Sequence, residues 1–292
     1  MYSNARQKIR LCCFLIVLPV TLFGQSFTGT ISDGESGTRL PYASIGVKGK
    51  SIGGIADSKG YFAISIANAS PTDTIVVSYL GYLATTFVKR ELSQSVYQIK
   101  LVPTPLQLHE VVAQGKREVK TIGNKKASSQ YTGWGDYISS RGRLRGVAIE
   151  TTEIPLKLAR FHMRLDACEF DSVRFRLHIL PLKENYSGNL NTELIDENIF
   201  FTAHKDQKWV NIDLNPYNIV IHQSIVVAVE WVDSWVKKES RNESYKLTIS
   251  LSREDGYAYI RETPEEPFTA TKSKLTPTMY FEAHKPGNSD TP

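Results

Sequence analysis

The stretch Gly60-Tyr61-Phe62-Ala63-Ile64-Ser65-Ile66 alternates between large apolar side chains and smaller or more polar ones. Successive side chains of a β-strand point to opposite faces of a sheet, so Phe62, Ile64 and Ile66 share one face. The residues just before it, Asp57-Ser58-Lys59-Gly60, are of the kinds that tight turns favour. The stretch therefore predicts a half-buried strand, and it decides the fold class as all-β.

Short runs of the same kind continue on both sides of this stretch. Between residues 26 and 103, runs rich in Val, Ile, Tyr, Phe and Thr are broken by Gly, Asp, Asn and Pro. This spacing is typical of a β-sandwich. The predicted strands are Ala43 to Val47, Gly60 to Ile66, Thr74 to Tyr79, Ala84 to Val88 and Val96 to Leu101.

Four elements of this region also resemble a known family. Gly29 to Asp33, Gly37 to Ile45, Gly53 to Phe62 and Ser78 to Tyr82 follow, in order, the pattern of the carboxypeptidase-regulatory-like domain of Bacteroidetes-type proteins. The resemblance covers residues 26–103 and implies a seven-stranded, prealbumin-like β-sandwich. It implies no peptidase activity, because in this family the module is an appendage beside other domains.

Two features follow this domain. Leu108 to Gly115 resembles the LxEVVVxG segment that comes after the same module in SusC-like outer-membrane receptors. The next residues are polar and basic, and five cations stand there against Glu118 alone. We therefore expect a solvated basic linker over residues 104–130.

Residues 131–285 return to strong alternation. Apolar side chains recur at every second position in Phe161 to Leu165, Val173 to Ile179 and Ile225 to Trp231. Turn residues such as Asn215-Pro216 separate these runs. The pattern predicts a second β-sandwich of jelly-roll type, followed by a disordered tail over residues 286–292.

The second domain also resembles a domain that recurs in secreted Bacteroidetes proteins of unknown role. The resemblance is carried by Phe170 to Arg176, Trp209 to Leu214 and Val229 to Trp231. It implies no established activity.

The first 25 residues have the order of a secretory signal peptide. Arg6, Lys8 and Arg10 precede an apolar run from Leu11 to Phe23, and small residues follow it. We expect cleavage after this segment and export to the periplasm, outer membrane or cell surface. Removing three of the five net positive charges leaves a mature protein near +2, too mild a charge to argue for a nucleic-acid partner.

No motif in the sequence supports enzymatic chemistry. None of the six histidines has the spacing of two metal ligands on one helical face. No nucleophile elbow, phosphate-binding loop or dinucleotide fingerprint occurs either. We expect no catalytic residue, no metal and no cofactor, and no enzyme.

Two strand segments carry a basic outer face. The polar positions that alternate with the core set are Arg160, His162, Arg164, Arg174, Arg176 and His178. If the two strands are neighbours in one sheet, these cations gather and require acidic partners or an anionic ligand. Both alternatives stay open. The acidic candidates are Glu150, Glu153 and Glu230, and the anion-binding candidates are Arg160, Arg164, Arg174 and Arg176.

The tryptophans divide into two groups. Trp209 and Trp231 lie in strand patterns and are predicted core residues. Aromatic rings in glycine-rich or charged surroundings offer platforms for sugar rings, so Trp134, Tyr137 and Trp235 are candidates for glycan contact, with ordinary packing as the alternative.

Together these features predict an exported, non-enzymatic binding or structural module of the cell envelope. Its expected partner is a glycan or an envelope protein, and not nucleic acid. The alternative function is that of an accessory component of a SusC-like outer-membrane transport system, which the Leu108 to Gly115 segment favours.

Overall fold

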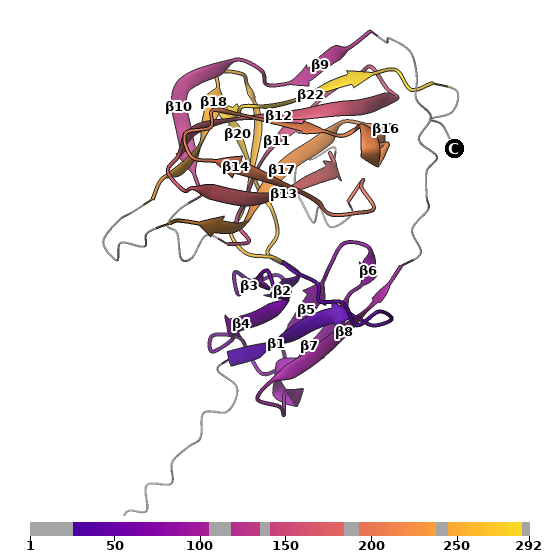
Figure 1. The fold of residues 1–292 in the computed structure, drawn as a ribbon, viewed down its shortest axis with the longest axis vertical. Helices are drawn as coiled ribbons and strands as arrows, with labels where there is room; N and C mark the ends of the chain where they lie inside the picture. Colours follow the sequence, from indigo (N-terminus) through magenta and orange to yellow (C-terminus); the bar gives the residue numbers. More distant parts are fainter. Residues whose placement is uncertain (1–25, 105–117, 135–140, 184–192, 238–244, 288–292) are drawn as a thin grey trace, which may run out of the picture.

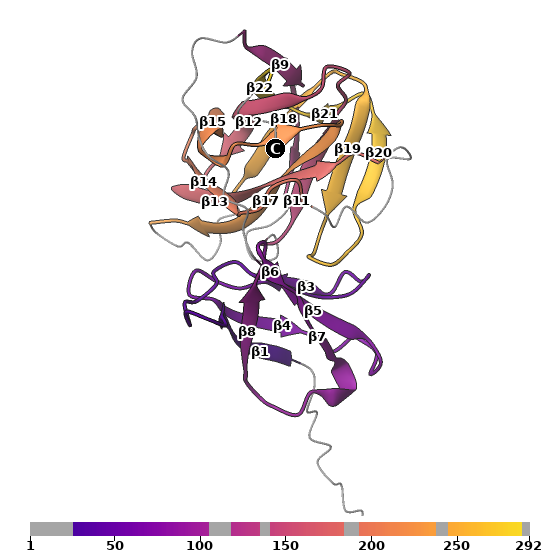
Figure 2. The same ribbon diagram turned by 90° about the vertical axis from the view of Figure 1, so that its right-hand side faces the viewer.

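The computed structural model describes residues 26–104, 118–134, 141–183, 193–237 and 245–287. Within these residues the regular structure consists of β-strands and two short 3₁₀-helices, so the predicted all-β class is confirmed. Figure 1 shows two β-sandwich domains stacked end to end, and the turned view in Figure 2 agrees. Among the described residues, no helix has the length and apolar character needed to cross a membrane.

The first domain is a sandwich of two four-stranded sheets, with strand orders β4-β1-β8-β6 and β3-β2-β5-β7. Its elements are β1 (Ser26–Asp33), β2 (Ser44–Val47), β3 (Gly53–Ile55), β4 (Tyr61–Ser65), β5 (Thr74–Ser78), β6 (Tyr82–Leu83), β7 (Thr85–Val88), the 3₁₀-helix η1 (Lys89–Glu91) and β8 (Tyr97–Pro103). There are eight strands where the resemblance implied seven. The short β3 contains Gly53 and Gly54 and lies between the predicted strands Ala43 to Val47 and Gly60 to Ile66.

The alternation in β4 behaves as predicted. Phe62 and Ile64 are 1% and 8% exposed, whereas Tyr61 on the other face is 45% exposed. The buried side chains of both sheets form one hydrophobic core, in which Phe27 contacts Phe62 and Phe87. This domain therefore has its own core.

The second domain is also a sandwich. Its elements are β9 (Lys120–Gly123), β10 (Ala127–Gly133), β11 (Leu144–Ile149), β12 (Leu156–Cys168), β13 (Ser172–Pro181), β14 (Ile199–His204), β15 (Trp209–Asp213), the 3₁₀-helix η2 (Asn215–Tyr217), β16 (Val220–Ile221), β17 (Ile225–Trp235), β18 (Leu247–Ser252), β19 (Gly256–Arg261), β20 (Thr269–Ser273), β21 (Thr276–Pro277) and β22 (Met279–His284).

One sheet of this domain has the order β10-β18-β12-β22-β9, with β15, β16 and β21 at its sides, and the other has the order β14-β13-β17-β11-β19-β20. The chain crosses from one sheet to the other at most of its turns, as the jelly-roll prediction requires. The predicted alternating side chains fill the space between the sheets, and Phe161, Phe175 and Trp231 are all 0% exposed.

The prediction of a solvated basic linker over residues 104–130 is partly wrong. β9 lies inside it and pairs with β22 along the edge of the larger sheet, and β10 begins there and pairs with β18. Lys120 of β9 forms an ion pair with Glu153. A polar edge strand carries few apolar side chains, so its composition is easily mistaken for that of a linker. Residues 105–117 of the expected linker, the signal segment 1–25 and most of the expected tail lie outside the described residues.

The expected neighbours β12 and β13 lie in different sheets. The turn between them carries Phe170, which is 0% exposed and packs its ring against those of Trp231 and Tyr245. This buried turn residue lies where the chain crosses from one sheet to the other. The two basic strand faces therefore point to opposite sides of the sandwich, so the condition under which their cations would gather on one face is not met.

Candidate functional site

The outer face of β13 is covered by the first domain. Arg176 donates to the main-chain oxygen of Tyr42 at 3.1 Å and to the Ser44 hydroxyl at 3.3 Å. Arg174 lies over the rings of Tyr42 and Phe200, at 5.6 and 5.2 Å from their centroids. The two sandwiches are thus joined through the face that the sequence marked as basic.

A second set of contacts comes from the loop between β19 and β20. The Gly49 amide donates to the main-chain oxygen of Glu265 at 3.0 Å, and the hydroxyl of Ser78 donates to the Glu265 carboxylate at 3.4 Å. The hydroxyl of Ser51 donates to Glu266 at 2.6 Å. These polar contacts hold the loop of the second domain against β5 and against the turn between β2 and β3 of the first.

Two residues at this junction have a left-handed backbone. Tyr42 has φ of 61° and Glu265 has φ of 58°, a region that side chains other than glycine rarely adopt. Such strain persists only where the surrounding contacts fix it, and it clusters at binding sites. Both residues make contacts between the two domains, so the strain lies at the junction itself.

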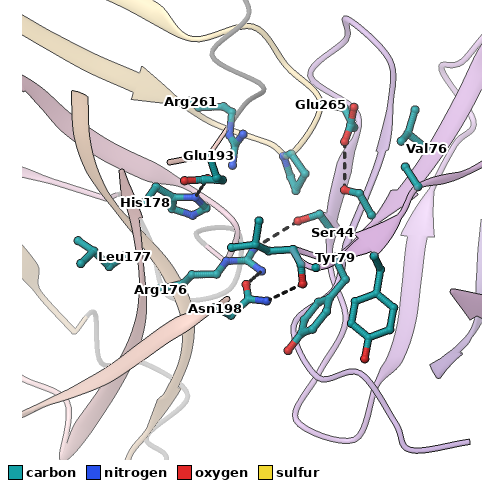
Figure 3. A pocket seen from close by; sticks show the side chains of 16 residues that line it. Ser44, Val76, Tyr79, Arg176, Leu177, His178, Glu193, Asn198, Arg261 and Glu265 are labelled. Carbon is teal, nitrogen blue, oxygen red and sulfur yellow. Dashed lines mark hydrogen bonds and ion pairs between the residues drawn. The ribbon is translucent and has the colours of Figure 1, made fainter. Parts of the chain in front are cut away.

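Between the domains these contacts border a partly open cavity of about 350 Å³. That volume lies within the range of small-molecule sites, although towards its lower end. Figure 3 shows that side chains from both domains line it. The lining residues used below are Ser44, Ser78 and Tyr79 from the first domain and Arg176, His178, Glu193, Asn198, Arg261 and Glu265 from the second.

A buried charge network forms one wall of the cavity. Glu230 of β17 is 0% exposed and accepts from Arg176 Nε at 2.6 Å and from His178 Nε2 at 3.0 Å. The other ring nitrogen of His178 lies 2.6 Å from a carboxylate oxygen of Glu193. Neighbouring strands place these groups in contact, since Glu230 faces Arg176 in the register of β17 and β13.

The network fixes the charge of its central carboxylate. Burial opposes ionisation, but Arg176 and His178 outweigh it and hold the pKa of Glu230 at about 2. Burial also opposes protonation of His178, yet Glu193 and Glu230 raise the pKa of His178 above its usual value. At the opposite wall, burial raises the pKa of Glu265. The network thus supplies ion pairs to one wall of the cavity, whereas the ionised form of the Glu265 carboxyl at the other wall is disfavoured.

Asn198 and Tyr79 complete the lining. The Asn198 amide accepts from Arg176 at 3.3 Å and donates to the main-chain oxygen of Leu80 at 3.4 Å. Tyr79 follows β5 and packs its ring edge-on against that of Tyr82 at 5.5 Å. An amide with two long hydrogen bonds and an aromatic ring can both contact a small polar ligand.

The four candidate arginines are divided between two faces. Arg174 and Arg176 lie at the domain junction, and Glu230 neutralises Arg176, so the acidic-partner alternative is confirmed there. On the opposite face, Arg160 lies 3.8 Å from Glu282, and Arg164 lies over the ring of Trp209 at 5.8 Å. The four arginines do not form one anion site.

The aromatic candidates also separate. Trp134 is 0% exposed and packs against Phe175 with 5.5 Å between ring centroids, so the prediction of a surface platform is wrong for this residue. It directly follows β10, whose end turns the ring into the core. Trp235 is 43% exposed at the end of β17, and Tyr137 lies outside the described residues. Trp231 is a core residue as predicted, whereas Trp209 is only partly buried, on an outer face.

Sequence reasoning missed Glu193, Asn198, Arg261 and Glu265. These residues lie far apart in the chain and form no spaced motif. Of the cavity residues, Ser44, Ser78 and Tyr79 belonged to recognised elements of the first domain, and Arg176 belonged to one of the second. The described residues contain no cluster of three or more side chains able to bind a metal ion. Burial raises the pKa of the Cys168 thiol to about 11, which keeps it protonated and poorly nucleophilic.

Comparisons with solved structures give only weak likenesses. Two structures of Cwp84 from Clostridium difficile, one of them holding its cysteine protease and lectin-like domains, have TM-scores of 0.35 and 0.41 at 12% and 9% identity. They are matched over 56% and 80% of this chain, which spans 37% and 52% of theirs. A candidate carbohydrate-binding protein from Bacteroides uniformis has a TM-score of 0.20 at 13% identity, over 85% of this chain and 98% of its own. These likenesses are too weak to support an argument.

The comparison with curated proteins found no match. The comparison with family models agrees with the resemblance of the first domain. The model of the CarboxypepD_reg-like domain matches residues 27–113, which cover the first domain from Phe27 onward.

Proposed function

We propose that this protein is a non-enzymatic binding module of the cell envelope that holds a saccharide in the cavity between its two domains. One observation carries the proposal: planar hydrogen-bonding side chains, hydroxyl groups and an aromatic ring from both domains line a single cavity (Figure 3). An apolar ligand would leave those polar groups unpaired, which is unfavourable. A sugar offers many hydroxyls as well as an apolar ring face.

The location of the cavity gives the ligand a second role. Its walls belong to the CarboxypepD_reg-like domain on one side and to the six-stranded sheet on the other, so a bound sugar contacts both. The junction around it is polar, and polar junctions between domains permit relative motion more readily than large apolar ones. Saccharide binding is therefore expected to hold the two domains together.

The test is a glycan array with the protein, followed by titration calorimetry with the strongest binder. Asn198→Ala removes a cavity amide and is expected to weaken binding by about tenfold. Asn211→Ala is the matched control, because the Asn211 side chain contacts His162 at 2.6 Å on the opposite face of the domain. Absence of any bound glycan, or equal losses in the two variants, would contradict the proposal.

Export is proposed on the sequence of residues 1–25 alone, with the periplasm, outer membrane or cell surface as the destination. Fractionation of cells producing the full chain, with detection of the processed N-terminus, checks this. Recovery of unprocessed protein in the cytoplasm would contradict it.

The alternative, an accessory role in a SusC-like transport system, is favoured by the segment Leu108 to Gly115. It requires a stable complex with such a receptor. Co-purification of the tagged protein with an outer-membrane receptor, lost when this segment is deleted, would favour the alternative over a freestanding saccharide-binding module.

A further inference from the structure

Arg261 is the charged side chain of the cavity that has no hydrogen-bond or ion-pair partner among the described residues. It stands at the end of β19 and is partly buried. Its guanidinium lies over the ring of Phe268 at 4.8 Å, and its Nε is enclosed with no hydrogen-bond acceptor. Burial lowers the pKa of Arg261, and the charges of Glu230, Glu193 and Glu265 oppose this shift without forming a hydrogen bond or ion pair with it. Figure 3 shows its side chain extending towards the cavity, with no interaction drawn to it.

The other charged groups of the cavity are already engaged. Arg176 is bound to Glu230 at 2.5 Å. Glu193 contacts His178 at 2.6 Å and accepts from the Ile179 amide at 3.2 Å. The remaining carboxyl, Glu265, accepts from Ser78 and has a raised pKa, so its ionised form is disfavoured. An additional anion would therefore meet its unsatisfied partner at Arg261.

A partly buried guanidinium without a hydrogen-bond acceptor favours a ligand that brings one. Its planar fork of donors matches the two oxygens of a carboxylate, and such charge-assisted pairs are stronger than hydrogen bonds between neutral groups. The partly buried setting strengthens the pair further, because less water competes for the donors than at an exposed surface. The same cavity supplies hydroxyl and amide groups for the rest of a sugar.

We infer that the ligand is a carboxylated saccharide, of the uronic acid class, whose carboxylate pairs with Arg261 while its hydroxyls contact Asn198, Ser44 and Ser78. This inference rests on the proposed function and narrows it. It assigns Arg261 as the residue that distinguishes acidic sugars from neutral sugars of the same shape.

The experiment uses the full chain on an array that carries neutral oligosaccharides beside oligosaccharides of galacturonic and glucuronic acid. The strongest acidic binder is then titrated beside the same oligosaccharide with its carboxylates converted to methyl esters. Esterification removes the charge and keeps the sugar ring, so the wild-type protein is expected to bind the ester at least about tenfold more weakly.

Variants locate the effect. Arg261→Gln is expected to lose about tenfold or more in affinity for the acid and almost nothing for the ester, whereas Arg261→Lys keeps the charge and retains part of the preference. Unchanged thermal midpoints in both variants show that the fold is intact. The comparison of acid with ester on the wild-type protein needs no variant and stands even if Arg261→Gln fails to fold.

The outcomes separate the two proposals. Binding of neutral sugars only, or equal losses for acid and ester in Arg261→Gln, overturns the assignment of a carboxylated ligand and leaves the saccharide site in place. Failure to bind any glycan, or binding that is insensitive to Asn198→Ala, overturns the proposed function and this inference with it.

Discussion

The outer faces of β12 and β13 carry nearly the same residues in different surroundings. On β12, Arg160 is exposed, and the His162 ring stacks on Tyr280 with 4.3 Å between centroids. On β13, Arg176 and His178 are 4% and 8% exposed and are bound to a fully buried glutamate. A period-two pattern of cations thus indicates which face of a strand is polar, and does not indicate whether solvent or another domain covers that face.

The two outer faces differ in exposure because different groups pack against them. β17 brings Glu230 beside β13, and the first domain adds the main-chain oxygen of Tyr42 and the Ser44 hydroxyl. β22 brings Glu282 beside β12, where its contact with Arg160 spans 3.8 Å and remains partly exposed. Buried, short and multiply bonded pairs contribute far more than exposed, long ones, which gives the comparison measurable consequences.

Truncation of a core side chain on the inner face should destabilise the protein equally in either strand. This is the largest effect on the free energy of unfolding that we expect. Phe161 of β12 and Phe175 of β13 are both 0% exposed, and each packs against Phe201. Truncation to alanine in either strand is expected to cost about 3 to 5 kcal/mol in the free energy of unfolding, measured by denaturant titration. A loss below about 1 kcal/mol at only one position would show that the two strands do not share one core.

The outer faces should respond differently to removal of their acidic partners. Glu230→Gln leaves the buried Arg176 without a counter-charge and leaves His178 with Glu193 alone, and it is expected to cost about 3 kcal/mol. Glu282→Gln, the matched change on the β12 face, is expected to cost less than about 1 kcal/mol. Equal losses in the two variants by denaturant titration would mean that the first domain does not cover β13 in solution.

The sequence was sufficient to predict the strands and their buried faces, but it was not sufficient to predict which strands share a sheet. Alternation places Phe161 and Phe175 inside because it reports the period of a single strand. It carries no information on which strands are neighbours, so it could not place β12 and β13 in separate sheets. Phe170, an apolar residue in the turn between them, was the available signal that the chain turns a corner there.

The cavity was even less predictable from the sequence than the pairing of the strands. Its lining comes from residues as distant as Ser44 and Glu265, and only tertiary contact brings them together. Trp134 was misplaced for a related reason. Its glycine-rich neighbours indicated an exposed loop, yet the ring completes the core under Phe175. Local composition indicates the conformation of the backbone, but it does not indicate whether one large side chain is buried.

The pH dependence of stability should report the β13 face. The pKa of Glu230 is about 2, below its ordinary 4.5, so its contribution is present above pH 4.5 and is lost as the pH falls towards 2. The pKa of His178 is raised above 6.5, so its contribution is present below pH 6.5 and is lost as the pH rises through the higher value. Wild-type stability is expected to decline on both sides of this window.

Glu230→Gln should flatten the acid side of that profile by an amount on the order of 2 kcal/mol, because glutamine has no proton to gain. Denaturant titrations at intervals from pH 3 to pH 8 measure the free energy of unfolding of the wild-type protein and of Glu230→Gln. An unchanged acid limb in Glu230→Gln would show that other carboxyl groups cause the loss, and that the β13 network is not the site of the titration.

The smallest expected effect belongs to the exposed cation of the β12 face. The Arg160 side chain is 58% exposed, and its nearest carboxylate oxygen lies 3.8 Å away, so solvent screens the pair. Arg160→Gln is therefore expected to change the free energy of unfolding by less than about 0.5 kcal/mol. Arg176→Gln removes the same kind of group from an enclosed position and should cost several times more. If Arg160→Gln instead cost more than about 1 kcal/mol, the β12 face would be enclosed in solution, and size-exclusion chromatography would then show whether a second copy of the chain covers it.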